Sequence, residues 1–132
     1  MAFRTLLLLA LTIFLTACNI SGHGLKGPFL DGSKVTISPL NNQSISDNSR
    51  TITTNSQNNN GYYQFNRVNW EGWTEINIEG QFINEFNGLK SDNSILLKAI
   101  TNKTTPYHHA NVNLFSHLAT ARIQKLASTG SN

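Results

Sequence analysis

The chain has 132 residues, of which 10 are Lys or Arg and 7 are Asp or Glu, and its formal net charge is +3. This length supports one domain and excludes a large multi-domain enzyme, while the absence of heptads and the single short apolar run exclude a coiled coil and a polytopic membrane protein. The basic residues form no cluster in the sequence, which argues against nucleic acid as a partner.

The first 17 residues have the composition of a signal peptide. Arg4 supplies a positive charge, and the apolar stretch over residues 6–15 is too short to cross the roughly 30 Å hydrocarbon layer comfortably. The stretch ends in the motif Leu15-Thr16-Ala17-Cys18. This motif resembles the lipobox of bacterial lipoproteins. The resemblance implies that the Cys18 thiol is alkylated by diacylglycerol, that the preceding peptide bond is cut and that the new amine is acylated.

Cys18 is the only cysteine in the chain. A lone thiol in an oxidising compartment has no disulfide partner, so a lipid role explains both its presence and its solitude. Several acyl chains give an effectively stable attachment, which makes the lipid bilayer the expected partner. The next residue is Asn19, which by resemblance to enterobacterial lipoproteins favours the outer membrane. An ordinary secretory signal with an incidental cysteine and an uncleaved anchor are the alternatives.

The chain after the signal divides into three predicted segments. Residues 18–26 comprise the lipidated cysteine and a polar, glycine-containing stretch without a period, which is predicted to be a flexible tether. Residues 27–115 are predicted to form one β-domain because apolar and polar residues alternate in several short runs. Residues 116–132 are predicted to form an amphipathic helix and a polar tail.

Short alternating runs predict the strands of this β-domain. Their apolar positions are Val35, Ile37, Ile76, Ile78, Ala110, Val112 and Leu114, and two further pairs that share a face are Tyr63 with Phe65 and Phe82 with Phe86. Residues 95–100 are apolar on both faces apart from Lys98, which favours a more central strand. Turn formers such as Asn87-Gly88 separate the runs, so the predicted fold is an antiparallel β-sandwich. The expected core consists of Val35, Ile37, Phe65, Ile76, Ile78, Phe82, Leu97, Val112 and Leu114.

After Phe115 the apolar spacing becomes helical. The residues that recur at this spacing are Phe115, Leu118, Ala119, Ile123, Leu126 and Ala127. Ser116 is a candidate N-cap for the helix. A helix of about twelve residues is marginal in isolation, so it needs a surface to pack on. It either folds back over the sandwich or is the start of something longer.

Over residues 27–126 the chain resembles a group of bacterial lipoproteins. The matching segments include Gly27-Pro28-Phe29-Leu30-Asp31-Gly32-Ser33, Gly61-Tyr62-Tyr63-Gln64-Phe65, Leu97-Lys98-Ala99-Ile100 and Asn111-Val112-Asn113-Leu114. The Thr-rich stretch that leads into Gly61–Phe65 also resembles the carboxypeptidase regulatory-like, transthyretin-like sandwich. The resemblance implies this fold and an envelope location, and it supplies no catalytic residue.

Candidate catalytic and metal-binding residues are few. His108, His109 and His117 are the only cluster of metal-type ligands, but adjacent strand residues point to opposite faces, so loop and helix-start roles are favoured over a zinc site. Glu75 and Glu79 share a strand face that alternation predicts to be solvated, and nothing in the sequence supplies the cleft that paired catalytic carboxylates need. Gly-x-Ser-x-Gly, phosphate-loop and CxxC motifs do not occur. We therefore expect no catalytic residue, no bound metal and no cofactor.

The best candidate for ligand binding is an aromatic platform formed by Trp70 and Trp73 near Tyr62. Flat aromatic rings stack on sugar faces or anchor peptides. The competing interpretation, which we favour, is that one tryptophan plugs the end of the sandwich and the other covers it.

Together these features predict a small lipoprotein of the bacterial outer membrane that acts as a noncatalytic structural or binding module, with an envelope protein or a glycan as the candidate partner. One alternative is the N-terminal anchor of a larger lipoprotein. An exposed apolar stripe along the predicted helix would favour this alternative, and a helix packed on the sandwich would count against it. The other alternative is a glycan or peptide binder that uses the tryptophan platform.

Overall fold

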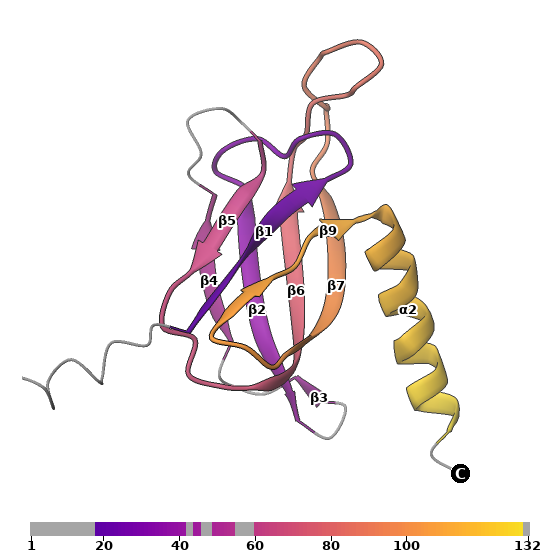
Figure 1. The fold of residues 1–132 in the computed structure, drawn as a ribbon. Helices are drawn as coiled ribbons and strands as arrows, with labels where there is room; N and C mark the ends of the chain where they lie inside the picture. The colour runs from indigo at the N-terminus through magenta and orange to yellow at the C-terminus, as the bar shows by residue number, and fades with distance from the viewer. Residues whose placement is uncertain (1–17, 42–43, 46–48, 55–59, 131–132) are drawn as a thin grey trace, which may run out of the picture.

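The computed structural model describes residues 18–41, 44–45, 49–54 and 60–130. These residues form two β-sheets and one C-terminal helix, which confirms the prediction of a mainly β fold that ends in a helix (Figure 1). The predicted signal segment, residues 1–17, lies outside the described residues.

The first sheet is built around β1 (Asn19–Leu25). β5 (Tyr62–Phe65) lies antiparallel to β1 along one side, with Phe65 opposite Ile20. β8 (Tyr107–His109) and β9 (Val112–Asn113) are both parallel to β1. Segments from the beginning, middle and end of the described chain therefore meet on β1.

The prediction of a flexible tether over residues 18–26 is wrong for Asn19–Leu25, because these residues form the central strand β1. The side of β1 that faces the core carries Ile20, Gly22 and Gly24, all of which are buried. Two of these three residues have no side chain, so the strand gives almost no hydrophobic alternation. Its glycines mark close packing against neighbouring segments and not flexibility.

The second sheet is antiparallel throughout. β2 (Lys34–Asn41) pairs with β6 (Gly72–Gly80), which in turn pairs with β7 (Ile95–Lys103). Two short strands, β3 (Ser44–Ile45) and β4 (Arg50–Thr53), also pair with β2. The strands predicted around Val35 with Ile37 and around Ile76 with Ile78 are thus confirmed as β2 and β6.

The prediction that residues 95–100 form a central strand is wrong for the described part of the sheet, where β7 pairs with β6 alone. Leu97 and Ala99 are buried in the core. The opposite face of β7 carries Leu96, Lys98 and Ile100, and the C-terminal helix packs against this strand. A covering helix and a second neighbouring strand leave the same signature in the sequence.

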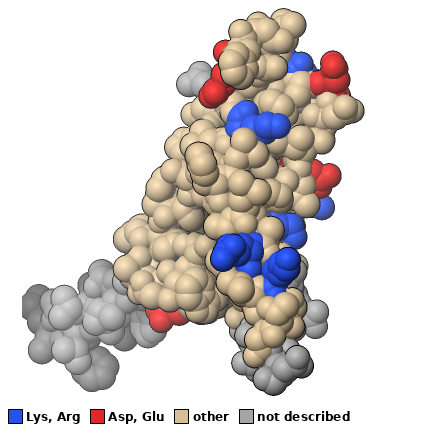
Figure 2. All heavy atoms as spheres, turned by 90° about the vertical axis from the view of Figure 1, so that its right-hand side faces the viewer, with Lys and Arg blue, Asp and Glu red and all other residues tan. Residues whose placement is uncertain are grey.

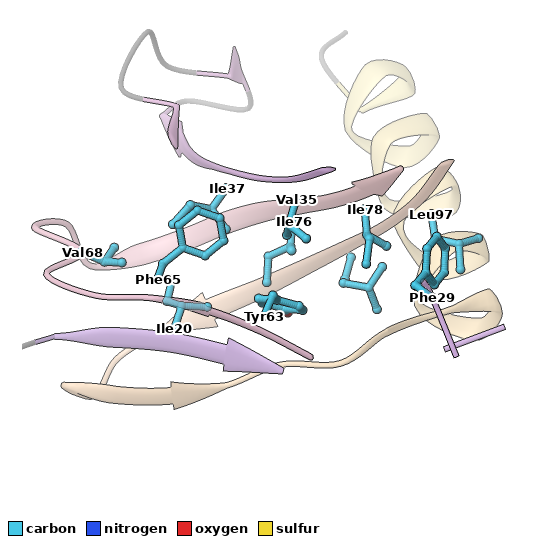
Figure 3. Close-up of a cluster of buried hydrophobic side chains, with 12 residues drawn as sticks. Ile20, Phe29, Val35, Ile37, Tyr63, Phe65, Val68, Ile76, Ile78 and Leu97 are labelled. Atoms are coloured by element: carbon cyan, nitrogen blue, oxygen red, sulfur yellow. The ribbon is translucent and has the colours of Figure 1, made fainter. Parts of the chain in front are cut away.

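One cluster of buried side chains fills the space between the two sheets, and both sheets contribute residues to this cluster (Figure 3). Its members are Ile20, Phe29, Val35, Ile37, Tyr63, Phe65, Val68, Ile76, Ile78, Leu97, Ala99 and Val112. Two predicted core residues differ, since Phe82 is only half-buried and Leu114 is 44% exposed. Phe86, predicted to share a buried face with Phe82, is fully exposed in the turn that follows.

The C-terminal helix, α2 (Leu114–Thr129), begins earlier than predicted. Its N-cap is Asn113 and not Ser116, because the Asn113 side chain accepts a hydrogen bond from the Ser116 backbone N–H at 2.9 Å. Ser116 completes the capping box and donates through its hydroxyl to the Lys98 carbonyl of β7 at 3.0 Å. Leu114 therefore starts the helix instead of ending a strand, which explains its exposure. No helix within the described ranges is long and apolar enough to span a membrane.

Candidate functional site

Cys18 lies at the beginning of β1 and is partly exposed, with a free thiol. Its carbonyl accepts a hydrogen bond from the Val68 N–H at 2.7 Å, and the next residue, Asn19, donates its N–H to the Pro106 carbonyl at 2.6 Å. The cysteine is thus joined directly to the folded domain. The end of the domain that surrounds it is formed by the connections that contain Val68 and Pro106.

The predicted aromatic platform is not formed by this fold. Trp70 is half-buried against the core, and its Nε1–H donates to the Thr74 hydroxyl at 3.0 Å. Trp73 is 56% exposed on β6 in the second sheet, whereas Tyr62 lies on β5 in the first sheet. Trp70 therefore has the packing role of the competing interpretation, and the three rings do not share one surface.

The three histidines predicted as a weak metal cluster are held apart. The His108 Nε2 lies 2.7 Å from the Thr101 hydroxyl, and the His117 Nδ1 accepts from the Lys98 N–H at 3.2 Å. Burial lowers the pKa of His108, and the charges of Lys103 and His109 lower it further. Among the described residues, no group of three or more His, Cys, Asp or Glu side chains is placed to hold a metal ion.

A different set of rings lies across three strands of the first sheet. The rings of Tyr62 on β5 and His23 on β1 have centroids 5.2 Å apart, and the rings of His23 and His109 on β8 have centroids 6.3 Å apart. This ring row, Tyr62–His23–His109, is absent from the sequence-based prediction, which places His23 in a tether. The signal that could have found it is the period-2 order of polar Asn19, Ser21 and His23 against Ile20 and two glycines.

The residues around the ring row are uncharged side chains that hydrogen-bond to one another and to the backbone. The Tyr62 hydroxyl donates to Gln64 Oε1 at 2.8 Å, and Gln64 Nε2 donates to Asn66 Oδ1 at 2.8 Å. The backbone N–H of His23 donates to Asn111 Oδ1 at 3.0 Å. None of the residues of β1, β5, β8 and β9 is Lys, Arg, Asp or Glu. This face offers imidazole, phenol and amide groups, which are suited to binding and not to nucleophilic or carboxylate chemistry.

Glu75, predicted to be solvated, is fully buried, and that prediction is wrong. Its carboxylate accepts from Asn77 Nδ2 and from Gln124 Nε2, both at 2.9 Å, and Lys98 Nζ lies 3.6 Å away. The cause is α2, which packs on the neighbouring strand β7 and reaches Glu75 through Gln124. These hydrogen bonds and this ion pair join β6, β7 and α2, so Glu75 fixes the helix to the sheet.

Comparison with protein-family models and with curated proteins gives no match for this chain.

Proposed function

We propose that this chain is a lipoprotein of the bacterial outer membrane, anchored through a lipidated Cys18 and acting as a noncatalytic structural or binding module. The observation that carries the proposal is the Leu15–Cys18 lipobox pattern, in which the only thiol of the chain directly follows the apolar segment. It is supported by the position of Cys18, which is partly exposed at the start of β1 and can carry an acyl chain without opening the core.

The transthyretin-like sandwich is part of the same proposal. It is supported by the core, because side chains from both sheets pack into one cluster, as the two inner faces of a sandwich do. In this arrangement the domain has no long spacer to the bilayer. Since β1 starts at Asn19, the end of the domain near Val68 and Pro106 is held against the lipid headgroups.

Replacing Cys18 by serine tests the anchor. We expect the wild-type chain to incorporate an alkyne-tagged fatty acid and to enter the detergent phase, and Cys18→Ser to lose the label completely, because the hydroxyl cannot form the thioether. The measurement combines metabolic labelling with intact-mass analysis of the purified chain.

The matched control restores a thiol elsewhere, by adding Ser128→Cys on the exposed end of α2 to the Cys18→Ser chain. This chain should remain unlabelled, because its thiol lies outside the lipobox. A wild-type mass that corresponds to a bare thiol, or label retained by Cys18→Ser, would show that the proposal is wrong.

A second candidate function, the N-terminal anchor of a larger lipoprotein, is favoured by the outer face of α2. The helix turns Ser116, Thr120 and Gln124 toward the sheet, while Phe115 and Leu118 are 84% and 66% exposed. Figure 2 views this side and shows a largely uncharged surface, with one group of Lys and Arg atoms in the lower half and further Lys, Arg, Asp and Glu atoms toward the top. An apolar face of this kind is suited to further protein packing against it. The docking of α2 on the sheet, which was expected to count against this candidate, leaves that face open.

The double substitution Phe115→Ser, Leu118→Ser tests whether this face serves binding or folding. We expect the free energy of unfolding to change by less than about 0.5 kcal/mol, as for exposed positions generally. Urea denaturation is the measurement, with buried Val112→Ala as the destabilised reference. A loss above about 1.5 kcal/mol would assign these side chains to the stability of the domain and remove the support for a docking face.

A further inference from the structure

We propose that His23 and His109 together bind one divalent transition-metal ion on the outer surface of the first sheet. β1 and β8 run parallel with Ser21 opposite His109, so His23 and His109 lie on neighbouring strands and on the same face. Both side chains are accessible, since His23 is half-buried and His109 is exposed. The site uses neither the Cys18 anchor nor the outer face of α2.

The ring separation fits one shared ion. An imidazole nitrogen lies about 2.0–2.1 Å from a bound metal, so the centroids of two imidazoles on one ion are at most roughly 6.5 Å apart. The separation of 6.3 Å between the His23 and His109 rings lies near this upper limit, so it fits one ion held with the two imidazole nitrogens on nearly opposite sides of it. In the proposed site one nitrogen of each ring faces the ion, and water completes its coordination.

The two rings are supported by their surroundings. The Tyr62 ring packs on the side of His23 away from His109, which restricts the positions that the His23 ring can take. The hydrogen bond from the His23 N–H to Asn111 Oδ1 ties β1 to the segment that follows β8. Because both ligands project from paired strands, little conformational entropy is lost when the ion binds.

The donor set selects the class of ion. Imidazole suits Cu²⁺, Ni²⁺ and Zn²⁺, whereas Mg²⁺ and Ca²⁺ require oxygen ligands, and Cu²⁺ binds most tightly among the divalent first-row ions. The other two histidines of the chain make hydrogen bonds elsewhere, His108 with Thr101 and His117 with the Lys98 N–H. They serve as internal controls for the pair.

The test is a Cu²⁺ titration of the full chain in detergent micelles, with Cys18→Ser so that no thiol competes. Calorimetry should give one ion per chain, and electron paramagnetic resonance should show two imidazole nitrogens on the copper. Since removing even an outer-shell partner costs 10–100-fold in affinity, His23→Ala and His109→Ala should each weaken binding by at least about tenfold. His117→Ala should bind as the parent does.

Thermal unfolding without metal, followed by circular dichroism, shows that each variant is folded. An affinity equal to that of the parent chain in either His23→Ala or His109→Ala, or a spectrum with a single nitrogen donor in the parent chain, would overturn the proposal. Because every chain in this experiment lacks the thiol, the result does not depend on whether Cys18 is lipidated.

Discussion

Replacing Gly22 by alanine is expected to destabilise the domain by about 3 kcal/mol or more, a large effect for one methyl group. A Cβ at this position would overlap the Ala110 carbonyl, with the Ala110 carbon at 2.7 Å and the Tyr63 hydroxyl oxygen at 2.8 Å. Backbone atoms cannot rotate away as a side chain can, so the segment between β8 and β9 must move. That movement also disturbs the hydrogen bond from the buried Tyr63 hydroxyl to the Ala110 carbonyl.

The matched control is Gly88→Ala, which adds the same methyl group where nothing lies within 4 Å. Gly88 has a φ of +69°, so the substitution costs only about 1 kcal/mol of backbone strain. Urea unfolding of both variants separates steric exclusion from conformational preference. If residues 19–25 were a tether, Gly22→Ala would leave the unfolding midpoint unchanged or raise it slightly.

The reason β1 escaped prediction lies in its inward-facing residues. The strands β2 and β6 carry Val35 with Ile37 and Ile76 with Ile78 at alternate positions, and these apolar side chains make the period visible. β1 replaces two of its three inward positions with glycine, because other segments lie where their side chains would be. A sequence shows which residues are apolar, but it does not show which glycines have another segment of the chain packed against them.

For the C-terminal helix, the sequence predicts the secondary structure but not which face packs on the domain. Its spacing correctly indicates helical structure, but the apolar face does not pack on the sheet. The outer surface of the second sheet carries Glu75, Asn77 and Lys98, so the side of α2 that docks there carries Ser116 and Gln124. Which side of an amphipathic helix faces the domain depends on the surface it meets, and the local pattern holds no information about that surface.

The candidate sites also differ in whether the sequence alone can reveal them. The motif Leu15–Cys18, which resembles a lipobox, is contiguous, so its four residues can be recognised without any knowledge of the fold. The ring row joins His23, Tyr62 and His109 from strands that are far apart in the chain, and only the pairing of β5 and β8 with β1 brings them together. Trp70 and Trp73 are close in sequence, yet the change from a loop to a strand between them directs the two rings to different surroundings.

Replacing Glu75 by alanine is expected to lower the free energy of unfolding by about 2–3 kcal/mol and to loosen α2. Removing one partner of a buried ion pair costs about 3–5 kcal/mol when the other charge stays buried. We expect less here because the Lys98 side chain is 29% exposed and can turn toward water. Gln124 and Asn77 would lose their acceptor, so amide hydrogen exchange should rise along α2 before it rises in β6.

Glu79→Ala is the matched control, because it removes the same side chain from an exposed position of the same strand and should change stability by less than about 0.5 kcal/mol. A double-mutant cycle of Glu75→Ala with Gln124→Ala should give a coupling of about 1 kcal/mol, the size of a hydrogen bond to a charged group after partial compensation by water. Equal unfolding midpoints for Glu75→Ala and Glu79→Ala would mean that α2 does not cover this face in solution. In that case both the polar side and the apolar side of α2 would be exposed to solvent. The apolar side would then no longer be the one surface that α2 offers to a partner.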